Sequence, residues 1–134
     1  LLAALLGATA AHAQSADGTW LTQAGDARVK ISKCSGGICG VVAWLREPYD
    51  TATGQPATDS KNPNRELARR PMIGLPLFSG MQPSGPNKWS GQIYNADDGS
   101  TYASSISVTG ADSLRVEGCV GALCGGETWT RAGR

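Results

Sequence analysis

Histidine is almost absent from this chain of 134 residues, and its single histidine, His12, lies in an N-terminal segment that we expect to be removed. The remaining chain then has no imidazole for a Ser-His-Asp triad, for a His-ligated zinc ion or for proton transfer near neutral pH. No two carboxylates have a spacing that predicts their convergence. We therefore expect no enzymatic activity, no cofactor and no metal site.

The net charge is also small. The chain has 12 Lys and Arg residues and 11 Asp and Glu residues, which gives a formal charge of +1. Only 17% of the residues are charged. This balance argues against a polybasic nucleic-acid-binding protein and against a disordered chain kept in solution by repulsion. The length fits one domain.

The N-terminus has the character of an export signal. Residues 1–11 form an uncharged run rich in Leu and Ala, and Ala11-His12-Ala13 follows the small-x-small pattern of signal peptidase sites. The run is shorter than the roughly 20 apolar residues that cross a bilayer, so we expect no stable membrane insertion. An amphipathic helix is disfavoured because the run has no polar face. We predict a signal peptide remnant at 1–13, a domain at 14–134, and a periplasmic or secreted protein.

Four cysteines occur in two frames of the same pattern, Cys-x-Gly-x-(Ile/Leu)-Cys-Gly, at Cys34 to Cys39 and at Cys119 to Cys124. Sequence alone allows three pairings. A glycine-containing loop of four residues between strand-like segments predicts a hairpin, whose flanking residues face each other. We therefore predict the disulfides Cys34–Cys39 and Cys119–Cys124.

A site of four thiolates for zinc is the alternative, since its usual spacings include this one. Export into an oxidising compartment and the hairpin context disfavour it. A catalytic redox pair is typical of Cys-x-x-Cys at the start of a helix, which neither frame matches.

Short alternating segments predict about eight strands, with little helix. They lie near 17–21, 27–31, 40–45, 72–78, 89–94, 102–108, 114–116 and 127–131. Residues 48–62 form a long loop, and Asn62-Pro63 predicts the start of a helix of at most two turns before Pro71. This order predicts an all-β antiparallel barrel with one short helix.

Several motifs carry a family resemblance. Gly18-Thr19-Trp20 resembles the Gly-x-Trp start of lipocalin-type barrels, and Trp129-Thr130-Arg131 resembles their closing strand. The others are Asp59-x-x-Asn62-Pro63, Arg70-Pro71-x-Ile73-Gly74-Leu75, Gly91-x-Ile93-Tyr94-Asn95 and Gly99-x-x-Tyr102. Together they are similar to the small secreted bacterial proteins of domain-of-unknown-function family 2147. The resemblance implies a lipocalin-like barrel with an interior cavity and no agreed activity. The second cysteine pair and Asn95-Ala96 depart from the family pattern.

Arg70 is the candidate ligand-binding cation, because a guanidinium at the mouth of a barrel can hold a carboxylate in two hydrogen bonds. Inward aromatic residues of a small barrel either pack or line a pocket. The aromatic candidates are Trp44, Trp89, Tyr94 and Tyr102.

Other residues favour structural roles. Trp20 with Arg131 predicts a cation-π contact at one end of the barrel. Asp59 and Asn62 are expected to brace the long loop. Asp97-Asp98-Gly99 supplies too few ligands for calcium and is expected to be a turn. The excess of Lys and Arg at 61–70 is expected to be a solvated surface.

These observations favour a non-catalytic barrel that binds a small apolar or anionic molecule, with Arg70 as the contact for an anionic group. The alternative is a structural or protein-interaction module of the bacterial envelope, whose protein partners the sequence does not name.

Overall fold

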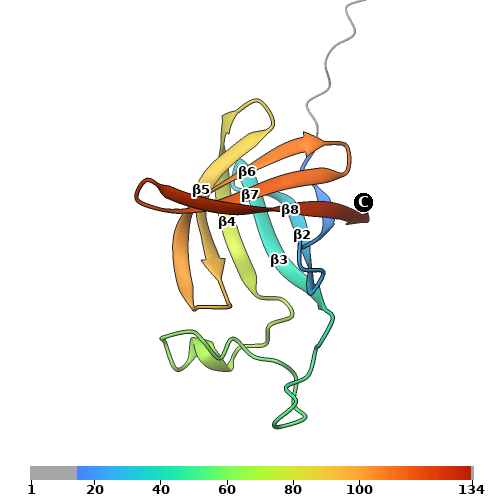
Figure 1. The fold of residues 1–134 in the computed structure, drawn as a ribbon, viewed down its shortest axis with the longest axis vertical. Helices are drawn as coiled ribbons and strands as arrows, with labels where there is room; N and C mark the ends of the chain where they lie inside the picture. Colours follow the sequence, from blue (N-terminus) through green and yellow to red (C-terminus); the bar gives the residue numbers. More distant parts are fainter. Residues whose placement is uncertain (1–14, 134) are drawn as a thin grey trace, which may run out of the picture.

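The protein is a closed antiparallel barrel of eight strands, described by a computed structural model over residues 15–133 (Figure 1). The predicted signal peptide at 1–13 lies outside the described residues. The strands are β1 (Gly18–Leu21), β2 (Ala27–Cys34), β3 (Gly37–Leu45), β4 (Pro76–Gly85), β5 (Lys88–Asn95), β6 (Ser100–Gly110), β7 (Ser113–Val120) and β8 (Leu123–Gly133). The predicted all-β barrel is confirmed.

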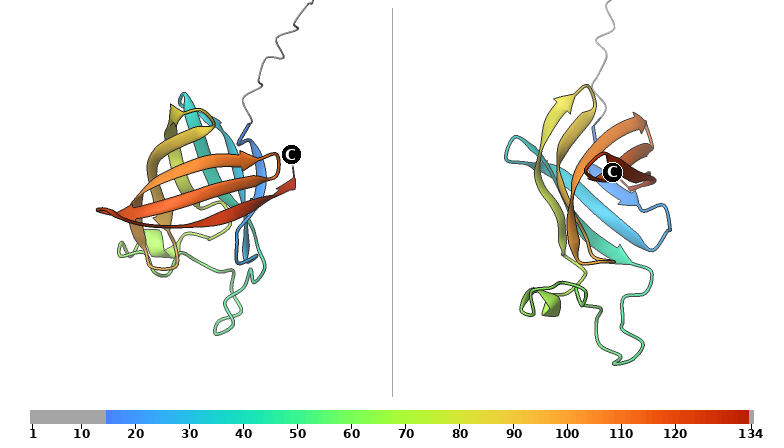
Figure 2. Two further views of the ribbon diagram at one scale, coloured as in Figure 1. Left: turned by 45° about the horizontal axis from the view of Figure 1, so that its top comes forward. Right: turned by 60° about the vertical axis from the view of Figure 1, so that its left-hand side comes forward.

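Every strand pairs with the next one along the chain, and the pairing of β1 with β8 closes the barrel. The long segment 46–75, between β3 and β4, lies outside the barrel near one of its ends (Figures 1 and 2). The turn between β5 and β6 reaches the same end, because Gly99 approaches the Lys61 carbonyl. This end of the barrel therefore carries the only long loop among the described residues.

Alternating apolar residues form the core, as the sequence pattern predicts. On β2, Val29 and Ile31 are buried and Lys30 between them is exposed. On β6, Ile106 and Val108 point inward in the same way. The buried core consists of Ala16, Trp20, Val29, Ile31, Ile38, Phe78, Met81, Ile106, Val108, Leu114, Val116 and Trp129.

One glycine in the barrel wall is required by a close approach. Gly40 on β3 pairs with Phe78 on β4, and a Cβ at Gly40 would lie 2.3 Å from the Phe78 ring. Phe78 thus covers the bare backbone of Gly40 and fills this part of the interior.

Two predicted elements differ from the structure. The strand expected at 72–78 begins only at Pro76, because Gly74 and Leu75 hydrogen-bond irregularly with Val42. The helix expected to begin at Asn62 is a single 3₁₀ turn, Leu67–Arg69. Asn62 does not cap it, because its amide donates to Asp59 and its carbonyl oxygen accepts from Asn64.

Both predicted disulfides, Cys34–Cys39 and Cys119–Cys124, are present, so no cysteine is free for zinc. Their registers differ although their sequence frames match. Cys119 lies directly opposite Cys124, whereas Cys34 pairs with Gly37 and its disulfide crosses the ladder diagonally. The first hairpin turns at Ser35 and Gly36, both with positive φ, which shifts its register relative to the cysteines.

The predicted contact of Trp20 with Arg131 is confirmed. The guanidinium carbon lies 4.2 Å from the centre of the Trp20 ring. Arg131 also donates to the carbonyls of Asp17 and Ser15, at 2.8 and 3.2 Å. It therefore fastens β8 to the segment before β1.

Candidate functional site

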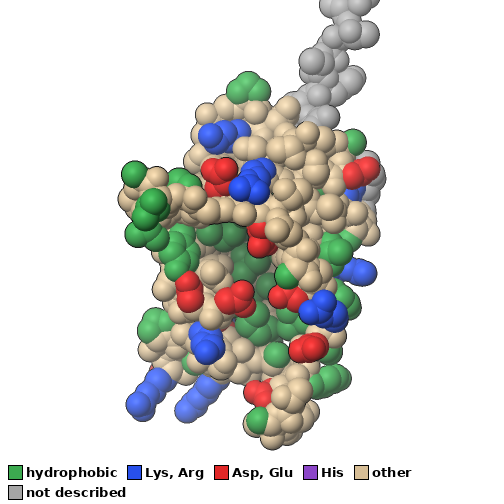
Figure 3. All heavy atoms as spheres, viewed as in Figure 1, with side chains coloured by type: hydrophobic (Ala, Val, Ile, Leu, Met, Phe, Trp, Pro, Cys, Tyr) green, Lys and Arg blue, Asp and Glu red, His purple; other side chains and the backbone are tan. Residues whose placement is uncertain are grey.

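A cavity of about 760 Å³ opens at the end of the barrel that faces the long loop. Residues of strands β2 to β8 line it, and Met72 of the long loop also contributes. Figure 3 shows this hollow with hydrophobic side chains inside it. The apolar and aromatic lining residues are Ala24, Ala27, Val29, Val42, Leu45, Met72, Leu77, Ile93, Tyr94, Ala96, Tyr102, Val116, Val120, Leu123, Cys124 and Trp129.

Trp129 is the largest buried side chain of the lining. Its indole Nε1 donates a hydrogen bond of 2.6 Å to Glu127 Oε1. The indole is therefore fixed in orientation, with its polar edge satisfied by a residue of its own strand.

The charged part of the lining is acidic. Asp26, Asp97, Glu117 and Glu127 line the cavity, and no Lys or Arg does so among the described residues. Acidic side chains gather around the hollow in Figure 3. Asp26 precedes β2, Asp97 lies in the turn after β5, and the two glutamates lie on β7 and β8.

The tip of the β7–β8 hairpin extends the apolar surface beyond the barrel. Val120 and Leu123 are 65% and 82% exposed and also line the cavity. The disulfide Cys119–Cys124 lies just behind them. The mouth therefore has an apolar edge held by a covalent link.

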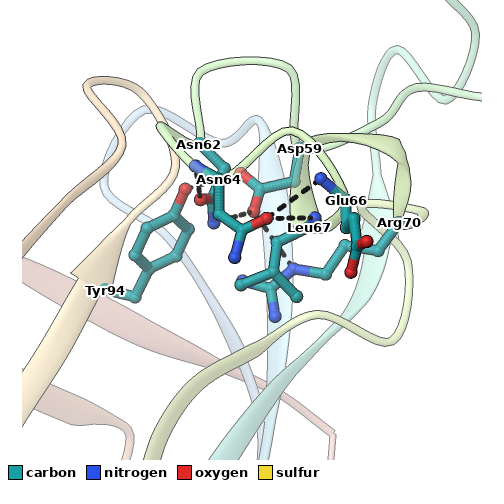
Figure 4. A network of polar contacts seen from close by, with 7 residues as sticks. All are labelled: Asp59, Asn62, Asn64, Glu66, Leu67, Arg70 and Tyr94. Carbon is teal, nitrogen blue, oxygen red and sulfur yellow. Dashed lines mark hydrogen bonds and ion pairs between the residues drawn. The ribbon is translucent and has the colours of Figure 1, made fainter.

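Beside the cavity, Asp59 anchors the long loop to the barrel (Figure 4). Its buried carboxylate accepts a hydrogen bond of 2.7 Å from the Tyr94 hydroxyl. Asn62 Nδ2 and Arg70 Nε donate to its other oxygen, at 3.0 and 3.1 Å. Arg70 also lies over the Tyr94 ring, with 5.5 Å from its guanidinium carbon to the ring centre. Asp59 and Asn62 thus brace the loop, as predicted.

Two tyrosines of the cavity wall have raised pKa values. Burial, and then the hydrogen bond to Asp59, raises the pKa of Tyr94 above its ordinary value of 10.0. For Tyr102, the hydrogen bond to Asp98 is the main cause of a raised pKa. Both hydroxyls are hydrogen-bond donors to carboxylates, so the proton is retained at neutral pH.

The predicted ligand residues separate into two groups. Tyr94 and Tyr102 line the cavity. Trp44 instead packs under Arg28, 4.5 Å from ring centre to guanidinium carbon, and Trp89 lines a second pocket of about 590 Å³ beside the β2–β3 hairpin. Arg70 does not line the cavity, because Asp59 holds it outside.

The sequence interpretation missed the acidic rim. Its four residues come from four separate segments, and no spacing relates them. The Asp98 carboxylate, in the predicted turn, accepts hydrogen bonds from Ser100 N and from the Tyr102 hydroxyl.

Among residues 15–133, no three His, Cys, Asp or Glu side chains come together as a metal-binding group. In the same part of the chain, no helix is long and apolar enough to span a membrane.

An eight-stranded antiparallel barrel closed by a Trp–Arg contact, with one end open to an apolar cavity, is a lipocalin-like fold. Protein HP1028 from the human pathogen Helicobacter pylori, described as belonging to the lipocalin family, has a similar structure. The TM-score is 0.72 at 21% sequence identity, over 88% of this chain and 83% of that chain. Residues 18–131 match the model of a family of uncharacterised proteins conserved in bacteria, DUF2147, and the chain belongs to that family. No curated protein matches the sequence.

Proposed function

We propose that this protein is an exported, non-catalytic barrel that binds a small, largely apolar molecule in the cavity beside the long loop. The volume of the cavity carries the proposal, since about 760 Å³ lies within the roughly 300–1,000 Å³ of small-molecule sites. Such sites combine apolar and aromatic walls with a few polar groups, which is the composition of this lining.

Binding rather than catalysis is supported by the state of the tyrosines. The hydroxyls of Tyr94 and Tyr102 donate to Asp59 and Asp98, and their pKa values are raised. Both phenols therefore stay protonated at neutral pH, so neither supplies a phenolate as base or nucleophile. Two disulfides support export, because they persist in oxidising compartments.

Titration with the neutral fluorescent probe N-phenyl-1-naphthylamine tests the proposal. We expect saturable binding at one site, with energy transfer from tryptophan, because Trp129 lies in the cavity wall. Ala27→Phe places a ring in the cavity and should abolish binding. Ala43→Phe, at an exposed position of the neighbouring β3, is the matched control and should bind as the wild type does. Absence of saturable binding, or equal binding by Ala27→Phe, would overturn the proposal.

A further inference from the structure

We propose that the molecule bound in the cavity is an organic cation: an apolar body inside the barrel and an ammonium-type group at the acidic rim. This inference rests on the proposed function and names the chemical class of its ligand. It differs from the anionic ligand that Arg70 alone suggested, because Arg70 is engaged outside the cavity.

The rim has an excess of negative charge. Asp26, Asp97 and Glu127 form no ion pair within the described part of the chain. The fourth lining acid, Glu117, has Arg115 Nε at 3.7 Å, and both side chains are about two-fifths exposed. An exposed pair of this kind is weak. Four carboxylates on low-dielectric walls attract a cation and repel an anion.

Arg70, which contacts the cavity-lining Tyr94, does not offset this charge. Arg70 lies beside Tyr94, but its Nε is 3.1 Å from the fully buried carboxylate of Asp59. The two charges compensate each other, so this pair adds little net positive potential at the rim.

The aromatic lining suits the same ligand. Tyr94, Tyr102 and Trp129 all border the cavity, and aromatic faces attract cations, including quaternary ammonium groups. The Arg70 guanidinium over Tyr94 already makes one such contact with a ring of this wall. An ammonium group near the rim thus has carboxylates and aromatic faces as neighbours.

An unsatisfied polar group lies deeper in the barrel. Ser104 is 7% exposed, and its hydroxyl is a buried side-chain group without a hydrogen-bond partner in the described residues. It follows Tyr102 on the inward face of β6 and pairs with Gly118, and both of those residues line the cavity. Ser104 itself does not line the cavity, so its hydroxyl is an unpaired group of the barrel interior next to the ligand site and not a group within it.

Competition against N-phenyl-1-naphthylamine tests the charge preference with three ligands that share a ten-carbon chain. They are decyltrimethylammonium, decanol and decanoate, each below its critical micelle concentration. We expect decyltrimethylammonium to displace the probe at the lowest concentration and decanoate at the highest. Added sodium chloride should reduce the difference, because salt screens charges at an exposed rim.

Charge-neutralising variants test whether the acidic residues of the rim cause the preference for a cationic ligand. Three substitutions keep the side-chain shape: Asp26→Asn, Asp97→Asn and Glu127→Gln. Each should lower the affinity for decyltrimethylammonium about two-fold to five-fold. Their combination should remove its advantage over decanol. The matched control combines Glu47→Gln, Asp50→Asn and Glu66→Gln, three exposed acids outside the lining with the same change of charge. It should retain the preference.

The outcomes separate the two proposals. If the neutral probe binds and decanoate competes as well as decyltrimethylammonium, the cation inference is overturned and the binding function stands. The inference also fails if the rim variants and the control lose the preference equally. Because the salt dependence is measured on the wild-type protein, the test does not depend on the folding of any variant. If the neutral probe does not bind, the proposed function and this inference both fail.

Discussion

The hydroxyl of Tyr94 donates a 2.7 Å hydrogen bond to Asp59 Oδ1, across 35 residues of sequence, and so joins the wall of the cavity to the loop outside it. Asp59 lies in the segment between β3 and β4, whereas Tyr94 lies near the end of β5. The same carboxylate holds Asn62 and Arg70. One buried acid thus determines where the long loop rests relative to the cavity.

Replacing this acid should change the titration of Tyr94. In Asp59→Asn, we expect the pKa of Tyr94 to fall towards 10.0, because the hydrogen bond to the carboxylate and its negative charge are lost while burial remains. The absorbance of tyrosinate during alkaline titration measures this change. Tyr94→Phe identifies the signal, and Tyr49→Phe, at an exposed position, serves as the control. An unchanged titration in Asp59→Asn would show that burial alone raises this pKa.

The same linkage predicts how stability depends on pH. The pKa of Tyr94 is higher in the folded protein than its ordinary value of 10.0. Its stabilising contribution is therefore complete below pH 10 and is lost as the pH rises through the folded-state pKa. Urea unfolding across this range should give a steeper alkaline loss of free energy for the wild type than for Tyr94→Phe. Parallel curves would contradict the assignment.

Gly99→Ala should displace the loop. Gly99 has φ of +73°, and a Cβ there would lie 2.0 Å from the Lys61 carbonyl oxygen. Gly74→Ala is the matched control, with φ of +92° and no atom within 4 Å of its Cβ. Backbone strain alone should cost Gly74→Ala about 1 kcal/mol. Gly99→Ala should cost clearly more, because it adds a clash with backbone, and unfolding in urea measures both.

Gly40→Ala should disrupt the interior of the barrel. Its Cβ would overlap the Phe78 ring, so Phe78 must leave its position, at a cost of about 1–3 kcal/mol. Gly125→Ala, whose Cβ meets nothing within 4 Å, should change the stability little. Gly40→Ala combined with Phe78→Leu should recover part of the loss if the clash is its cause. Thermal unfolding of the wild type, Gly40→Ala, Phe78→Leu and the double variant tests this, and full additivity of the two substitutions would contradict it.

The two disulfides should differ in their reduction. Cys124 is exposed at the hairpin tip, whereas Cys34 and Cys39 are half-buried and Cys39 Sγ accepts a hydrogen bond from Gly80 N. A mild reductant should therefore reach Cys119–Cys124 first. Alkylation at intervals followed by peptide mass spectrometry gives the order. Replacing Cys119 and Cys124 by serine should cost about 2 kcal/mol, since the closed loop is short. Simultaneous reduction of both bonds would contradict the difference in accessibility.

Local patterns were sufficient to predict the barrel, because alternation in strands and hairpin turns depends on neighbouring residues. Val29 and Ile31 show this, with Lys30 exposed between them. The helix start at Asn62 was wrong because a distant residue, Asp59, binds the side chain that would cap it, and this arrangement depends on Tyr94 and Arg70. Tertiary contacts therefore outweighed the local capping signal.

The cavity was predicted only in part for the same reason. Tyr94 and Tyr102 follow motifs within single strands and lie where a barrel lining was expected. The rim acids come from separate turns and strands, so their proximity depends on the register of the closed barrel. Arg70 has the chemistry of an anion site, but the buried Asp59 decides its partner.

The seam between β1 and β8 has a consequence for the kinetics of folding. All other pairings of the described barrel join strands that are adjacent in sequence, whereas this one joins the two ends of the described chain. Closing so large a loop costs the most chain entropy, which favours its formation after the hairpins. Arg131 joins the two strands of the seam through its contacts with Trp20 and with the Asp17 carbonyl. These contacts should then form after the folding transition state. Arg131→Met should speed unfolding and leave the folding rate nearly unchanged in stopped-flow experiments, and slower folding would place the seam in the nucleus.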